Sequence, residues 1–194
     1  MHANKSEATA GRSPKGFNLN SPGCNPGLRI KPTPIQPRRG CIRNIIMSTF
    51  TQIYYHIVFS TKNREPVLRA DGREELFRYI WGIIRNKNSH LYRINAVEDH
   101  LHILSSLHPS VALADFIKDI KVASNGWIQE QKLFPHFDGW QDGYGAFTAS
   151  HDDEDRLIEY IKNQQEHHRK ETFLDEYRRL LKEAGIEFDE KYLE

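Results

Sequence analysis

The order of hydrophobic patterns along residues 52–184 is the strongest constraint on the fold of this chain. Short runs of β-branched and aromatic residues alternate with longer segments that carry apolar residues at helical spacing. The predicted strands are residues 52–60, 91–97, 100–107 and 143–150. The predicted helices begin near Asp71-Gly72, at Ser110, at Ser150 and at residue 171. Up to the fourth strand, the order is therefore β-α-β-β-α-β.

This order is that of the ferredoxin-like motif, so we predict an α+β sandwich in which two helices cover one face of an antiparallel sheet. Two additional C-terminal helices follow. The first spans about 150–168, and Ser150 with Asp153 forms a loose capping box at its start. The second spans 171–184 and ends at Gly185. Its amphipathic pattern fits either closure of the core or a dimer contact.

Charge and composition divide the chain near Met47. Residues 1–46 hold eight basic residues and one acidic residue, a net charge of +7, together with six of the nine prolines. Residues 47–194 hold nineteen basic and twenty-five acidic residues, a net charge of −6. We predict a disordered basic arm at 1–46 and one folded domain at 47–194. The arm either attracts nucleic acid through its charge or lies upstream of a true start at Met47.

Several classes of protein are excluded by what the sequence lacks. No run approaches the roughly 18 apolar residues of a membrane-spanning helix. The first 46 residues have neither the apolar segment nor the cleavage site of a secretory signal. Both cysteines, Cys24 and Cys41, precede Met47, so the folded domain has neither a disulfide scaffold nor a cysteine metal site.

His100 and His102 form the first candidate site. Side chains alternate along a strand, so these two share one face while Leu101 and Ile103 occupy the other. Their Cα atoms would lie about 7 Å apart, which lets two imidazoles bind one metal ion. The alternative is a pair of histidines with ordinary hydrogen bonds. Asp99 either orients this pair or only marks the end of the strand.

Tyr160 and Gln164 form the second candidate site. Their i, i+4 spacing stacks them on one side of a helix, and Tyr160 falls outside the apolar arc. A cation held by two histidines and an amide oxygen keeps positions open for a phosphate, and this donor set suits Mg²⁺ or Mn²⁺. A nearby tyrosine could then attack the phosphorus. Alternatively, Tyr160 packs at the edge of the apolar face.

Around these residues the sequence resembles the HUH-type single-tyrosine transposases of bacterial insertion sequences and their relatives, the REP-associated tyrosine transposases. The resemblance covers about residues 50–193, and its segments occur in one order. They are Tyr55–Phe59, Asp99–Leu104, Phe116–Lys118 with Lys121 and Ser124, Gly143–Phe147, and Tyr160–His168. The resemblance identifies 47–194 as a single catalytic domain of this type.

The resemblance implies a DNA transposase. His100, His102 and Gln164 would bind Mg²⁺ or Mn²⁺, and Tyr160 would cleave single-stranded DNA at hairpin-containing ends. The tyrosine would become joined to the 5′-phosphate and release a 3′-hydroxyl, and the strand would later be rejoined. The resemblance further implies bacterial, cytoplasmic action and a homodimer, with a monomer as the alternative. Tyr160 could be supplied in cis or in trans.

Because the folded domain has a net negative charge, we expect any DNA contacts to come from small groups of basic and aromatic residues. Lys118, Lys121 and Asn125 lie on one predicted helical face and could contact DNA. Trp127 and Trp140 offer surfaces on which unpaired bases could stack. For the two lysines, the alternative is an ordinary solvated helix face.

Three other functions compete with the transposase. A relaxase or replication-initiator nickase would use the same chemistry, but such chains are usually longer. A non-catalytic, ferredoxin-like nucleic-acid-binding protein would carry stacking aromatic residues on its sheet in place of a histidine pair. A metallohydrolase would use the histidines alone, so Tyr160 would be dispensable.

Overall fold

The computed structural model describes residues 50–193, so the predicted arm at 1–46 lies outside the described residues. The strands are β1 (Tyr54–Ser60), β2 (His90–Ala96), β3 (His100–Ser106) and β4 (Gly145–Ala149). The helices are α1 (Ala70–Asn86), α2 (Leu113–Gln131), α3 (Glu154–Lys162), α4 (Gln164–His167) and α5 (Phe173–Glu183). Single 3₁₀ turns are η1 (Lys62–Arg64), η2 (His151–Asp153) and η3 (Glu190–Tyr192).

The four strands form one antiparallel sheet in the order β2-β3-β1-β4. Helix α1 connects β1 to β2, and α2 connects β3 to β4. This arrangement confirms the predicted ferredoxin-like α+β fold. The central strand β1 pairs with both β3 and β4, and its register places Val58 opposite His102 and His56 opposite Phe147.

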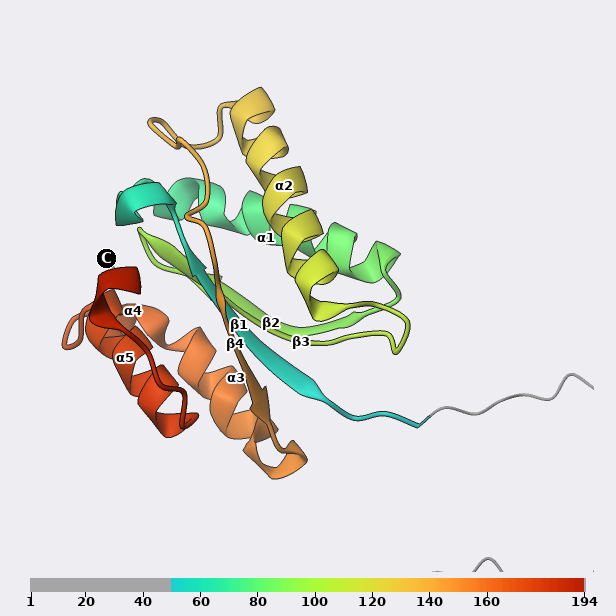
Figure 1. Cartoon of the computed structure of the whole chain (residues 1–194). Coiled ribbons are helices and arrows are strands. Elements are labelled where there is room, and N and C mark those ends of the chain that lie inside the picture. Colours follow the sequence, from blue (N-terminus) through green and yellow to red (C-terminus); the bar gives the residue numbers. More distant parts are fainter. Residues whose placement is uncertain (1–49, 194) are drawn as a thin grey trace, which may run out of the picture. The chain divides into compact units, whose positions relative to one another are not determined.

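Helices cover both faces of the sheet. Helices α1 and α2 lie on one face, and α3, α4 and α5 lie on the other (Figure 1). The larger core, under α1 and α2, includes Ile57 of β1 and Ile103 of β3. A smaller apolar cluster of Tyr54, Leu104 and Ile161 lies under α3. Because both faces are covered, β1 is buried along nearly its whole length.

Two predicted helix starts are wrong in detail. Helix α2 begins at Leu113 without a side-chain cap, because the Ser110 hydroxyl instead contacts Nδ1 of His108 at 2.7 Å. The segment after Ser150 first forms η2, and α3 begins only at Glu154. A local Ser or Asp can bond to neighbouring side chains as readily as to a helix N-terminus, so these sequence signals locate a start only approximately.

The predicted helix 150–168 is also interrupted. Asn163, with φ −94° and ψ 18°, separates α3 from α4. The amide nitrogen of Asn95 on β2 donates to the carbonyl oxygens of Ile161 (2.8 Å) and Lys162 (3.1 Å). This tertiary contact satisfies carbonyls at the end of α3, and the chain can turn there before Gln164.

Trp140 is part of the core and not the exposed stacking surface that we predicted. Its ring packs against Phe59 with 4.9 Å between centroids, and only 9% of the residue is exposed. Its indole nitrogen donates to the hydroxyl oxygen of Ser124 at 3.0 Å. The tryptophan is thereby held between the sheet and α2.

We expect Ser124→Ala to lower the free energy of unfolding by about 1–3 kcal/mol, because it leaves the buried indole N–H of Trp140 without an acceptor. Urea denaturation followed by circular dichroism measures this change. Ser110→Ala, at an exposed serine, should change it by less than about 0.5 kcal/mol. Equal stability of both variants would contradict the importance of this hydrogen bond.

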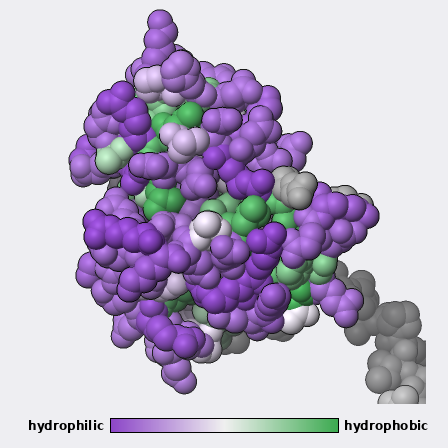
Figure 2. All heavy atoms as spheres, turned by 90° about the vertical axis from the view of Figure 1, so that its left-hand side faces the viewer, coloured by the Kyte–Doolittle hydropathy of each residue, from purple (hydrophilic) through white to green (hydrophobic). Residues whose placement is uncertain are grey.

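The surface on the side of α4 and α5 is mainly hydrophilic. Figure 2 shows hydrophobic side chains there only in separate small areas between hydrophilic ones. Within residues 50–193, no helix combines the length and the apolar character needed to cross a membrane. This face therefore shows no extended apolar band.

Candidate active site

His100 and His102 lie side by side on β3, on the sheet face that α3, α4 and α5 cover. Both are fully buried, but their surroundings are polar. His168 from the C-terminal end of α4 and Glu176 from α5 face them, and the ring of Phe173 stacks on His100 with 4.3 Å between centroids. Residues of α4 and α5 therefore enclose the predicted histidine pair.

Hydrogen bonds at Nδ1 orient both imidazoles. Nδ1 of His100 lies 2.7 Å from Oδ1 of Asp99, and Nδ1 of His102 lies 2.9 Å from Nε2 of His56. If each Nδ1–H donates in these contacts, each Nε2 keeps a free lone pair. Such Nδ1 contacts to a carboxylate or another acceptor are typical of metal-binding histidines. Both Nε2 atoms point to one place between the strand and α5.

Glu176 occupies the centre of this cluster. Its Oε2 lies 3.5 Å from Nε2 of His100, 3.5 Å from Nε2 of His102 and 2.9 Å from Nε2 of His168. The ligand atoms of the three histidines and of Glu176 all lie within 4.8 Å of one another. A carboxylate and two imidazoles at this spacing can share one cation.

The pKa values of this cluster show the effect of its carboxylates on the neighbouring histidines. Burial alone would raise the pKa of Glu176, but the three surrounding histidines hold it far below its usual range. Burial lowers the pKa of His100, yet the carboxylates of Asp99 and Glu176 outweigh this and raise it. Burial lowers the pKa of His102 to about 4, so this imidazole is neutral at pH 7. The carboxylates of Asp99 and Glu176 thus favour a positive charge in this cluster, next to the neutral imidazole of His102.

Gln164 and Tyr160 meet the same carboxylate. The amide nitrogen of Gln164 donates to Oε1 of Glu176 at 2.9 Å, and the Tyr160 hydroxyl donates to the same oxygen. The Tyr160 ring lies edge-on to His102, with 6.3 Å between centroids. One copy of the chain therefore brings the predicted nucleophile and the predicted ligands together.

Three unpartnered atoms test whether these residues suit a metal ion. Among residues 50–193, four buried side-chain polar atoms have no hydrogen-bond partner, and three belong to this site: Nε2 of His100, Nε2 of His102 and Oε1 of Gln164. Buried polar atoms are rarely left unpaired without a functional reason. All three are lone-pair donors once the histidines are neutral, so the donor set fits a divalent cation.

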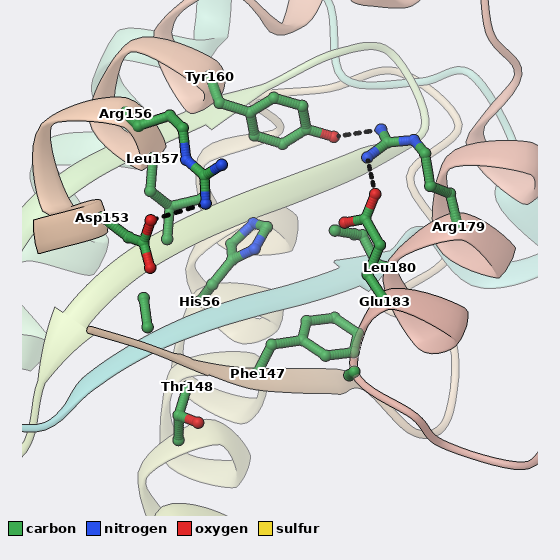
Figure 3. Close-up of a pocket in the computed structure, with 12 residues that line it drawn as sticks. His56, Phe147, Thr148, Asp153, Arg156, Leu157, Tyr160, Arg179, Leu180 and Glu183 are labelled. Carbon is green, nitrogen blue, oxygen red and sulfur yellow. Dashed lines mark hydrogen bonds and ion pairs between the residues drawn. The ribbon is translucent and has the colours of Figure 1, made fainter.

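Tyr160 lies at the boundary between this cluster and an open pocket. Burial and the charge and hydrogen bond of Glu176 raise the pKa of its hydroxyl, and Arg179 partly opposes this. Nη2 of Arg179 donates to the phenolic oxygen at 2.9 Å (Figure 3). His56 and Phe147 line the same pocket, with Tyr160 and Arg179 at its other side (Figure 3).

Apart from Trp140, the predicted DNA contacts lie on α2, which covers the opposite face of the sheet (Figure 1). Lys118 is exposed. Nζ of Lys121 donates to the carbonyl oxygens of Gln141 and Gly143, at 2.5 and 2.7 Å. Asn125 is half-buried, and Trp127 stacks on Tyr79 with 4.5 Å between centroids. DNA binding by these four residues stays a prediction.

Sequence reasoning missed Glu176 and His56. Glu176 lies three residues after Phe173 and four before Leu180, so a carboxylate stands beside the apolar face of α5. That position was a usable signal, because an acid there must find a buried partner. His56 carries no comparable signal, since only the pairing of β1 with β3 brings it to His102.

Over residues 49–164 the chain matches the protein family described as transposase IS200 like. It is 28% identical over 121 residues to the ISDra2 transposase TnpA of Deinococcus radiodurans, covering 58% of this chain and 84% of that protein. It is 25% identical over 117 residues to the transposase for insertion sequence element IS200 of Salmonella typhimurium, covering 58% and 76% respectively. The solved structure of a REP-associated tyrosine transposase bound to a REP hairpin aligns with 15% identity and a TM-score of 0.47, over 63% of this chain and 74% of that chain. Glu176 and Arg179 lie beyond the residues that match the family.

Proposed function

The chain belongs to the family of IS200-like transposases, enzymes that cleave and rejoin DNA, and we propose that it acts on single-stranded DNA through a covalent intermediate on Tyr160. The observation that carries this proposal is the convergence of Tyr160, Gln164 and both histidines on Glu176. A phenol beside a buried cluster of cation ligands is the arrangement that attack on a phosphodiester requires.

The proposed reaction is a transesterification. The phenolic oxygen of Tyr160 forms a bond to phosphorus, and the bond between phosphorus and the 3′ oxygen breaks. On balance, the phenolic proton ends on the released 3′ oxygen. The 5′-phosphate stays on the tyrosine as an ester, so a 3′-hydroxyl can attack it and restore a phosphodiester without a nucleoside triphosphate.

His100, His102, Gln164 and Glu176 are the residues that would hold a divalent cation. Their mixture of imidazole nitrogen and hard oxygen suits Mg²⁺ or Mn²⁺. A cation bound there would supply Lewis-acid polarisation of a phosphate oxygen. Asp99 and His56 keep the two imidazoles in the ligating orientation, and the enclosure by α5 excludes bulk water from them.

The proposed substrate is a DNA hairpin with a single-stranded flank, which the family resemblance suggests. The setting would be the cytoplasm of a bacterial cell. Because Tyr160 and the histidines meet within one chain, cis supply of the tyrosine is the simplest arrangement. The homodimer stays a prediction.

Incubation with a labelled hairpin oligonucleotide and Mn²⁺ or Mg²⁺ tests the proposal. We expect a protein–DNA adduct that survives a denaturing gel, and an unattached product that ends in a 3′-hydroxyl. EDTA should suppress the adduct to background, and excess Mn²⁺ should restore it. A fully duplex version of the flank should give no adduct.

Other outcomes identify the competing functions. Tight hairpin binding without any cleavage would favour the non-catalytic nucleic-acid-binding protein. Cleavage that leaves no covalent protein–DNA product would favour the metallohydrolase. An adduct with 5′-linked DNA, but with no rejoining to a second 3′-hydroxyl strand, would favour a nickase.

A further inference from the structure

Arg179 of α5 makes a direct contact with the oxygen atom of the candidate nucleophile. Its Nη2 lies 2.9 Å from the hydroxyl oxygen of Tyr160, and its guanidinium carbon lies 5.7 Å from the centroid of the same ring. The Arg179 side chain is 36% exposed. It therefore combines a fixed contact to Tyr160 with access to solvent.

Acidic neighbours hold this guanidinium in place. Glu171 accepts from Nε at 3.1 Å and from Nη2 at 2.9 Å, and Glu183 lies 3.4 Å from Nη1. A two-point contact to a carboxylate sets the plane of a guanidinium. The N–H groups of Arg179 are thus oriented before any substrate arrives, which is the condition for effective electrostatic catalysis.

Tyr160 lies between the buried cluster and a pocket. Glu176 and the histidine cluster occupy the buried side. On the other side lies a pocket of about 420 Å³ between β4, α3 and α5. Figure 3 shows Tyr160 and Arg179 together along one side of this pocket, with Arg156 on α3 beside it. A phosphate that reaches Tyr160 from this pocket also reaches Arg179.

We propose that Arg179 binds the scissile phosphate while it holds the phenolic oxygen of Tyr160, so that α5 aligns the nucleophile with the phosphorus. This inference rests on the proposed function and adds a residue from outside the family-matched part of the chain. In the proposed cleavage step, the phenolic oxygen of Tyr160 bonds to phosphorus and the bond between phosphorus and the 3′ oxygen breaks. On balance, the phenolic proton ends on the released 3′ oxygen. Negative charge on the phosphate oxygens is largest in the transition state, next to a fixed positive charge.

Single-turnover cleavage at saturating hairpin DNA tests the role of Arg179. Arg179→Gln keeps an N–H donor but removes the charge, and it should slow adduct formation by about ten- to hundredfold. Mn²⁺ affinity should change less than about threefold, because the hydrogen bonds of Arg179 go to Tyr160, Glu171 and Glu183 and not to the histidines. Arg179→Lys should be at least about threefold faster than Arg179→Gln, since it restores a positive charge.

Arg178→Gln is the matched control. Arg178 is the neighbouring residue on α5, and its guanidinium pairs with Glu190 and Asp175 instead of Tyr160. This control should cleave within about twofold of the wild-type rate. Addition of guanidinium to Arg179→Ala should accelerate cleavage at least about fivefold, and it should leave Arg178→Ala unchanged. A purely structural role for Arg179 would not respond to added guanidinium.

The possible failures are distinguishable. If the wild-type chain forms no adduct, the proposed function is wrong and this inference falls with it. If the wild-type chain forms the adduct and Arg179→Gln matches its rate, only the role of Arg179 is wrong. The inference would also be wrong if Arg179→Gln lost Mn²⁺ affinity, or its helical circular dichroism signal, by as large a factor as it lost cleavage rate. The slower cleavage would then be the result of a damaged structure.

Discussion

Replacing Tyr160 with phenylalanine should reduce formation of the covalent protein–DNA adduct by at least about 10⁴-fold. The variant lacks the only atom that could form the phosphotyrosine ester at this position. The fold should survive, because Glu176 keeps its contact with Gln164 and Arg179 keeps its contact with Glu171. Quantification of the adduct on denaturing gels, at equal protein and saturating hairpin, measures the effect.

Tyr144→Phe is the control for this prediction. Tyr144 is an exposed tyrosine just before β4, and it has 41% of its surface accessible. Its loss should leave adduct formation within about twofold of wild type. Hairpin binding by Tyr160→Phe should stay within about threefold of wild type. Adduct formation by Tyr160→Phe at an undiminished rate would assign the nucleophile to another residue and refute the proposed mechanism.

Replacing Glu176 with glutamine should weaken Mn²⁺ binding by roughly 10²- to 10³-fold. The substitution keeps the size of the side chain but removes the buried negative charge beside both Nε2 atoms. Loss of one partner in a buried charge pair costs about 3–5 kcal/mol, and the lower part of that range, about 3–4 kcal/mol, corresponds to this loss of affinity. Isothermal titration calorimetry with Mn²⁺ measures it without any DNA. Adduct formation should then require higher Mn²⁺ concentrations.

Glu183→Gln is the matched control on the same helix. Glu183 lies seven residues after Glu176, its side chain is 61% exposed, and it pairs only weakly with Arg179 at 3.4 Å. Its substitution should change Mn²⁺ affinity by less than about twofold. If Glu176→Gln and Glu183→Gln bind Mn²⁺ equally well, the carboxylate of Glu176 is not part of the cation site, and the histidines with Gln164 suffice.

Local periodicity predicted the elements of the fold but not their ends. The two-residue alternation of β3 placed His100 and His102 on one face, and the structure has them there. The helical stripe after residue 171 predicted α5, which spans Phe173–Glu183. The break at Asn163 was not predictable, because Asn95, 68 residues earlier in the chain, satisfies the carbonyls at the end of α3.

The candidate site was predictable only in part, for a related reason. Tyr160 and Gln164 are four residues apart, so their common direction follows from helix geometry. Glu176 and His56 enter the site through contacts between distant elements. The predicted DNA contacts show the same limit of sequence reasoning. The sequence alone does not reveal that Lys121 already donates to two loop carbonyls.

The sequence by itself determined the β-α-β-β-α-β order, the membership of the family and the residue types on which the proposed attack by a phenol depends. Each of these follows from spacing over a few residues or from similarity in aligned segments. Only the tertiary structure decided that α5 closes over the histidines, that Glu176 joins their site and that Arg179 meets Tyr160. Those contacts depend on how helices pack across a sheet, and the free energy of that packing is spread over side chains far apart in the sequence.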